Sequence, residues 1–225
     1  MFGNKLINTN AGGGCTDTVD LYNPFPDGGG VALYQLNGDA TDVSGNYDGT
    51  ATNVTYGAGE FGQAGVFNGT SSYISSATTN AFNLQTFTVS VWAKLNSFDA
   101  NPVLVSNSGT VENLGGTGWN VAYYNPNNAF YLGNNGVNLT FTTTPILTNV
   151  WYHIVATVDL TSNKIKIFLN GVFENENTYN GIDYGTGTRS LRIGKVGYYD
   201  DLYWNGSIDQ VRIFSRALRP YEVEA

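Results

Sequence analysis

Two glutamates at alternate positions, Glu174 and Glu176, come closest to a catalytic pair in this sequence. Glycoside hydrolases place two carboxyl groups on either side of the bond that they cleave, and alternate positions of a strand put both groups on one face. No further carboxylate follows this pair at a spacing that would complete a catalytic group. The chain also has one histidine, His153, and one cysteine, Cys15, which argues against histidine-based triads and multi-histidine metal sites. We therefore expect a protein that is not an enzyme, with a glucanase-like glycoside hydrolase as the alternative.

Aromatic residues next to Asp, Asn and Gly indicate a different chemistry, the binding of a sugar. The apolar face of a pyranose ring stacks on an aromatic ring, and polar neighbours bind its hydroxyl groups. The stretch GYYDDLYWNG at 197–206 is the densest of this kind, and GTGWNVAYYNPNN at 116–128 is a second. Tyrosines also build protein interfaces, so a subunit contact is the alternative. The candidate ligand-binding residues are Tyr198, Tyr199, Asp200, Asp201, Trp119 and Tyr123.

The loop NGDATDVSGNYDG at 37–49 contains three aspartates, Asp39, Asp42 and Asp48. Hard cations such as calcium take oxygen ligands from Asp side chains and loop carbonyls. The spacing is not that of an EF-hand. Turns in which Asp side chains bind their own backbone are the alternative.

Composition and charge narrow the class of protein. The 225 residues have a formal net charge of −8, whereas nucleic-acid binding requires a basic surface, so that class is excluded. With 41% hydrophobic residues the chain can bury one substantial core. No stretch approaches the ~20 apolar residues of a membrane helix, and the N-terminus lacks the apolar run of a cleaved signal peptide. We expect a soluble protein without membrane insertion.

From Val31 onward, short apolar runs alternate with Gly and Asn turns, which is typical of many short antiparallel strands. The pattern predicts an all-β fold, a sandwich or a jelly roll, over residues 31–225, with one short helix at 219–225. The expected strands lie within 31–36, 64–67, 87–95, 119–124, 129–132, 151–159, 164–172, 190–196 and 207–214.

Residues 1–30 differ from the rest, because they carry two triple-glycine runs and an Asn-Pro-Phe-Pro turn. Val19, Leu21, Tyr22 and Phe25 make this segment too apolar for a plain linker, and they would prefer a partner surface. We expect an N-terminal arm for attachment or oligomerisation, with a disordered leader as the alternative.

Several of these stretches occur in a characteristic order. The series resembles the laminin-G-like branch of the concanavalin A-like lectin–glucanase superfamily, of the single-domain type common in bacterial and phage proteins. The resemblance covers residues 31–222 and implies an antiparallel two-sheet jelly-roll sandwich whose N- and C-terminal strands meet. Members are mostly binding modules, and some cleave glycans. The stretches are VFNGTSSYI, FTVSVWAKL, NVWYHIVATVD, KIKIFLNGV, LRIGKV and WNGSIDQVRIFSRAL.

The resemblance makes residues 208–218 the closing strand, paired near 31–36, and places Trp204 in the core. Ile208, Val211 and Ile213 would face the core. The three arginines of this region then have packing roles that require no ligand, and we expect one of them to pair with a carboxylate or with turn carbonyls. They are Arg212, Arg216 and Arg219, of which Arg216 is the one expected to pair.

Members of the superfamily often carry a structural calcium ion. The resemblance therefore implies one possible cofactor, a calcium ion that Asp42 would share with Asn68 or Asp209. Asp209 would otherwise tie down a neighbouring loop.

The Asn-, Gly-, Thr- and Tyr-rich, Lys-poor composition also resembles phage fibres and appendages. A lectin-like domain normally works outside the cell, and a virion protein released by lysis needs no export signal. We expect a virion-associated decoration, fibre or adhesion subunit that forms a homo-oligomer. Its arm would contact other virion proteins, and its sandwich would bind host glycan or neighbouring subunits. A free-standing carbohydrate-binding lectin is the alternative.

Overall fold

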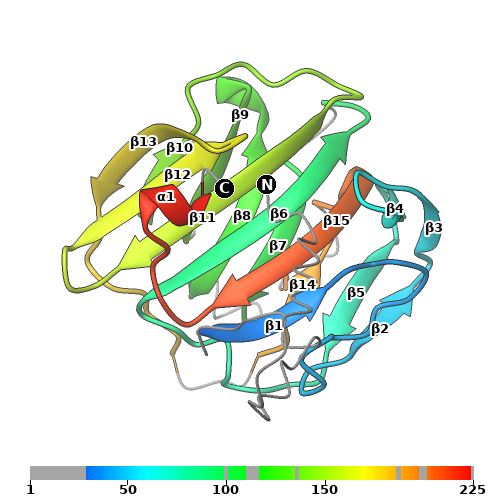
Figure 1. The fold of residues 1–225 in the computed structure, drawn as a ribbon, viewed down its shortest axis with the longest axis horizontal. Helices are drawn as coiled ribbons and strands as arrows, with labels where there is room; N and C mark the ends of the chain where they lie inside the picture. The colour runs from blue at the N-terminus through cyan, green and yellow to red at the C-terminus, as the bar shows by residue number, and fades with distance from the viewer. Residues whose placement is uncertain are drawn as a thin grey trace, which may run out of the picture.

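The computed structural model describes residues 29–98, 101–109, 117–134, 137–185, 189–197 and 202–223 (Figure 1). The predicted arm, apart from Gly29 and Gly30, lies outside the described residues, and so does Cys15. No helix in the described part of the chain is long and apolar enough to cross a membrane.

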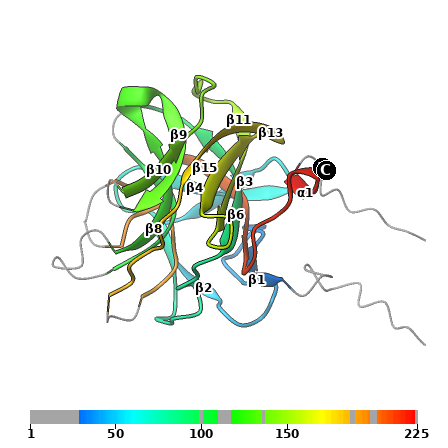
Figure 2. The same cartoon turned by 90° about the vertical axis from the view of Figure 1, so that its left-hand side faces the viewer.

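Two antiparallel sheets form a sandwich, which confirms the predicted fold class, and Figure 2 shows them as two layers. Sheet A contains, in spatial order, β13 (Val172–Thr178), β12 (Lys164–Leu169), β11 (Trp151–Asp159), β6 (Phe87–Leu95), β15 (Asn205–Phe214), β4 (Gln63–Asn68) and β3 (Thr55–Ala58), with β1 (Gly30–Tyr34) also paired to β15. Sheet B contains β10 (Val137–Phe141), β9 (Ala129–Asn134), β8 (Gly118–Tyr124), β7 (Val103–Ser108), β14 (Arg192–Ile193), β5 (Tyr73–Ser76) and β2 (Gly49–Thr52).

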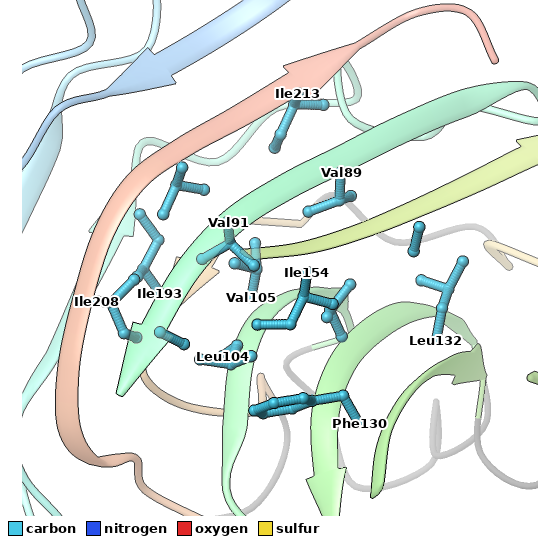
Figure 3. Close-up of a cluster of buried hydrophobic side chains, with 14 of the residues drawn as sticks. Val89, Val91, Leu104, Val105, Phe130, Leu132, Ile154, Ile193, Ile208 and Ile213 are labelled. Atoms are coloured by element: carbon cyan, nitrogen blue, oxygen red, sulfur yellow. The ribbon is translucent and has the colours of Figure 1, made fainter. Parts of the chain in front are cut away.

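The core fills the space between the two sheets. Val89, Val91 and Ile154 from sheet A and Val105 and Phe130 from sheet B point into it, and all are fully buried (Figure 3). Each such side chain contributes about 1.5–3 kcal/mol when it leaves water, so this cluster is the main source of stability. Phe87, Val89, Val91 and Ala93 share this buried face of β6, as the period of two in the sequence predicts.

The closing strand lies where the resemblance placed it. The second half of β15 pairs with β1, with Val211 opposite Tyr34, while its first half pairs with β4 and its whole length lies beside β6. Ile208, Val211 and Ile213 are fully buried, and Trp204 is buried as well. The chain then turns into the predicted short helix, α1 (Pro220–Val223).

Six of the described strands were not predicted from the sequence: β2, β3, β5, β7, β10 and β13. The sequence of β7, VLVSNS, reads as half polar, yet every residue in it is buried. Ser106 Oγ donates to the Lys195 carbonyl at 3.0 Å, and Asn107 Nδ2 donates to the Phe82 carbonyl at 2.8 Å. Hydrogen bonds to distant residues make these polar side chains acceptable inside the protein. Nothing in the local pattern reveals such partners.

Candidate ligand-binding face on sheet B

Alternation along the strands of sheet B sends every second side chain to its outer face. Ile74 of β5 and Ile193 of β14 lie in the core, so their neighbours Tyr73 and Arg192 point outward. In the same way, core residues Val121 and Tyr123 of β8 leave Tyr124 on the outer face.

Three rings form a cluster on this outer face, contributed by β8, β9 and β10. Tyr131 lies 5.5 Å from Phe141 and 6.1 Å from Tyr124, and the Tyr124 and Phe141 centroids are 5.8 Å apart. All three side chains are partly exposed. Partly exposed rings are the groups on which the apolar face of a sugar stacks. We call these residues the three-ring cluster.

A second group on the same face alternates cations with tyrosines. The Arg192 guanidinium lies 5.5 Å from the Tyr73 ring. The Lys195 ammonium lies 5.2 Å from the Tyr73 ring and 4.9 Å from the Tyr203 ring, and Nζ donates to Tyr203 Oη at 3.1 Å. Cations over tyrosine rings attract the negative face of the ring, which fixes both groups. We call these four residues the cation–tyrosine cluster.

A polar row crosses the same face next to this cluster. Arg192 of β14 is paired with Ser75 of β5 on one side and with Ser106 of β7 on the other, and Ser106 is paired with Asn120 of β8. Arg192 Nε and Asn120 Oδ1 are buried and have no hydrogen-bond partner. Buried polar groups in proteins are usually hydrogen-bonded, so a bound water is one partner that would satisfy these two atoms.

The segment that carries four predicted ligand residues begins and ends on this face. Gly197 N donates to Ser108 Oγ at 3.1 Å, and Val103 N donates to the Leu202 carbonyl at 3.0 Å, so both ends are fixed to β7. Leu202 packs against Val103. The predicted residues between these ends lie outside the described part of the chain. They are Tyr198, Tyr199, Asp200 and Asp201.

Comparison with known proteins identifies the family. A family model described as the concanavalin A-like lectin/glucanases superfamily matches residues 68–224. The chain belongs to this superfamily. The sequence matches no curated protein.

Solved structures of superfamily-like sandwiches show the same fold. Domain 4 of AbnA, a GH43 extracellular arabinanase from Geobacillus stearothermophilus, was solved in complex with arabinotriose. It is 23% identical, with a TM-score of 0.67 over 86% of this chain and 95% of that one. The CBM40 of Ruminococcus gnavus IT-sialidase, bound to alpha2,3 sialyllactose, is 15% identical, with a TM-score of 0.56 over 64% of this chain and 83% of that one. Trypanosoma rangeli sialidase is 15% identical, with a TM-score of 0.64 over 88% of this chain and 32% of that one.

The remaining two predicted ligand-binding residues, Trp119 and Tyr123, lie in the core. Trp119 and Tyr123 are each 1% exposed. The Trp119 ring stacks on Phe87 at 5.1 Å, and the Tyr123 ring stacks on Phe98 at 5.3 Å. Neither can therefore stack on a sugar from solution, which corrects the prediction. Aromatic density had selected them, whereas the alternation of β8 selects their neighbour Tyr124.

The residues predicted to share a calcium ion do not fit one in this structure. Both Asp42 carboxylate oxygens accept hydrogen bonds from protein groups: Oδ1 from the backbone of Leu33 and Ser44, and Oδ2 from Tyr47 N. Asn68 Oδ1 accepts from three backbone groups in the turn that follows it. The described residues hold no group of three or more His, Cys, Asp or Glu placed to bind a metal. The alternative of Asp and Asn turns accounts for these two residues.

Asp209 ties down a loop, as the resemblance implied. Its Oδ2 accepts a 2.9 Å hydrogen bond from Phe61 N, in the hairpin between β3 and β4. Burial raises the pKa of this carboxyl to about 6. Its row on the outer face of sheet A continues through Trp92 to His153, which stack at 5.0 Å. Burial and the nearby Arg212 lower the pKa of His153 to about 4, so the ring is neutral at pH 7.

The two glutamates of the hydrolase alternative are held by different partners. Glu174 accepts hydrogen bonds from the backbone and hydroxyl groups of Thr143 and Thr144. Glu176 pairs with Lys164 at 2.6 Å, and this hydrogen bond lowers the pKa of Glu176. The two carboxylates therefore do not flank a common space.

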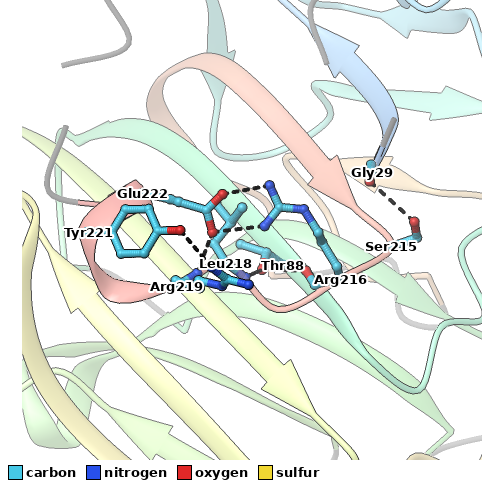
Figure 4. A network of polar contacts seen from close by, with 8 residues as sticks. All are labelled: Gly29, Thr88, Ser215, Arg216, Leu218, Arg219, Tyr221 and Glu222. Carbon is cyan, nitrogen blue, oxygen red and sulfur yellow. Dashed lines mark hydrogen bonds and ion pairs between the residues drawn. The ribbon is translucent and has the colours of Figure 1, made fainter. Parts of the chain in front are cut away.

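The C-terminal arginines close the fold (Figure 4). Arg216 donates to both carboxylate oxygens of Glu222, at 2.9 Å and 2.8 Å, which confirms the predicted carboxylate partner. Arg219 donates to Tyr221 Oη. Leu218 and Val223 pack with residues on the outer face of sheet A. The C-terminal segment thus covers part of that face.

Proposed function

We propose that this chain is a carbohydrate-binding domain without catalytic activity, and that its ligand lies on the outer face of sheet B. The observation that carries the proposal is the presence of two clusters of aromatic side chains on one face of one sheet. The three-ring cluster offers stacking surfaces, and the cation–tyrosine cluster adds polar groups beside them. Two similar folds, the AbnA domain and the CBM40, were solved with a bound sugar, which supports extending this class of ligand to the present chain.

The absence of catalysis is proposed from the carboxylates. Glu174 is bound to the 143–144 backbone and Glu176 to a lysine, so neither is free to act as acid or nucleophile. His153 is a half-buried side chain bonded to Ser90 at 2.8 Å and stacked on Trp92. We assign it a structural role.

Replacing Tyr124 with Ala tests the location of the site. The variant should bind glycans about tenfold more weakly than the wild type, because one stacking surface is lost. Phe61→Ala is the matched control, since this exposed ring belongs to the opposite sheet. A glycan array would first identify a bound sugar, and calorimetric titration would compare the variants. Equal affinity in Tyr124→Ala and the wild type would move the site away from this face, and a blank array would reject carbohydrate binding.

We further propose that the domain is a virion-associated decoration, fibre or adhesion subunit, with a free-standing lectin as the alternative. The Asn-, Gly- and Tyr-rich composition and the glycine- and proline-rich residues 1–28 support this. A deletion that tests this should end at residue 28, because the Gly29 carbonyl accepts a hydrogen bond from Ser215 N in the folded domain. Light scattering should show an oligomer that dissociates when residues 1–28 are deleted. A monomer in both forms would favour the free-standing lectin.

A further inference from the structure

We infer that Arg192 binds the carboxylate of an acidic sugar, so that the preferred ligands are glycans with uronic or sialic acid residues. This inference deepens the proposed function and rests on it. It concerns the chemical class of ligand that the outer face of sheet B selects.

The first argument is the pairing of Arg192. The ion pairs seen among the described residues join Lys164 and Lys166 to Glu176 and Arg216 to Glu222, and none involves Arg192. Its guanidinium instead contacts the Tyr73 ring, and its Nε donor is buried without an acceptor. Arg192 is partly exposed, so a carboxylate from solution can approach the accessible part of its guanidinium. A ligand carboxylate would supply the anion that the described residues do not.

The second argument is that the side chain is held in place. Arg192 lies on the two-residue strand β14, between β5 and β7, and the flanking residues of its row are Ser75 and Ser106. The Tyr73 ring supports the guanidinium from one direction, and the same ring contacts Lys195. A cation that is already positioned loses less conformational entropy when it binds a ligand.

The third argument is the chemistry of the guanidinium group. Its planar array of donors matches the two oxygens of a carboxylate, and such charge-assisted pairs are stronger than neutral hydrogen bonds. The Lys195 ammonium next to it adds positive charge to the same cluster. Tyr203 and the three-ring cluster supply rings for the rest of a sugar. A charged group beside stacking surfaces is the combination that distinguishes an acidic glycan from a neutral one.

The experiment compares matched acidic and neutral probes in calorimetric titrations. 3′-Sialyllactose is paired with lactose, and a galacturonic acid trisaccharide is paired with its methyl ester, so that the two arms separate sialic from uronic acids. The wild type should bind one acidic probe about 10- to 100-fold more tightly than its neutral partner, and this preference should weaken in high salt. Arg192→Gln should remove the preference, and Arg192→Lys should restore part of it. Equal thermal midpoints would show that the variants fold.

The outcomes separate the inference from the proposed function. If acidic and neutral probes bind equally, or if Arg192→Gln keeps the preference, the inference is overturned while carbohydrate binding stands. If the wild type binds none of the probes and no sugar on a wider array, both fail. If Tyr124→Ala weakens the acidic and neutral probes alike while Arg192→Gln weakens only the acidic ones, both are supported.

Discussion

The outer faces of the two sheets both carry arginines and aromatic rings, but they differ in what these side chains contact. On sheet A, Arg216 is paired with Glu222, and the C-terminal segment packs Leu218 onto the face. On sheet B, Arg192 and Lys195 contact tyrosine rings, and no described carboxylate forms an ion pair with Arg192. The C-terminal segment covers part of one face, and the other is the face on which we propose that the ligand lies.

This difference shows that the same residue types have different meanings according to their partners. Of the clustered C-terminal arginines, which are prominent in the sequence, Arg216 forms an ion pair with Glu222. The single arginine of the short strand β14 is not prominent in the sequence, yet it forms no ion pair with any described residue. A buried or closed ion pair holds parts of a protein together, whereas an uncompensated charge at a surface favours binding.

The largest expected effect is a loss of stability from the outer face of sheet A, which the C-terminal segment partly covers. Leu218 is 6% exposed in the cluster that joins the C-terminal segment to sheet A. Leu218→Ala should destabilise the protein by about 2–4 kcal/mol, because it removes buried methyl groups and leaves a cavity. Urea unfolding measures this loss, and Leu147→Ala, at a position that is 62% exposed, is the matched control with an expected loss below about 0.5 kcal/mol. If Leu218→Ala lost glycan affinity at temperatures where it stays folded, the two faces would not be independent.

A smaller effect, dependent on pH, is expected at Asp209 on the same face. Burial raises its pKa from 3.8 to about 6, so the folded protein holds this proton more tightly than the unfolded chain. The stability that the neutral carboxyl contributes is therefore present below about pH 4 and is lost as the pH rises through 6. Asp209→Asn keeps an oxygen for Phe61 N but does not ionise.

The stability of Asp209→Asn relative to the wild type should consequently rise by about 1–3 kcal/mol between about pH 4 and pH 7.5. Urea unfolding of both proteins at several pH values measures this difference. A difference that is the same at every pH would mean that the carboxyl ionises equally easily in the folded and unfolded states.

The smallest expected effects are losses of stability when one arginine on each face is replaced. Arg216→Gln breaks the partly exposed pair with Glu222 and should cost about 0.5–1 kcal/mol of stability. Arg192→Gln breaks no ion pair and should cost about 0.5 kcal/mol or less. Thermal unfolding of the two variants side by side tests the contrast. A larger loss for Arg192→Gln would indicate that this side chain is a structural residue.

Part of the fold could be predicted from local alternation, and the buried face of β6 matches that expectation. The pairing of the closing strand with β1 matches what the family resemblance implied. The strand β7 could not be predicted, because its polar residues depend on carbonyl groups far away in the chain. Trp119 was predicted at the surface because aromatic content was considered without the direction of the side chain.

The sequence by itself determined the all-β character and the period of two, which arise from neighbouring residues and from apolar content. The closing role of the C-terminal strand followed from the resemblance of the whole ordered series of stretches to the superfamily. Only the tertiary structure decided that Tyr73, Arg192 and Tyr203 meet on one face, since they lie on separate strands and loops. Their meeting depends on which strands pair across long stretches of chain, and it is the packing of the whole core that selects those pairs.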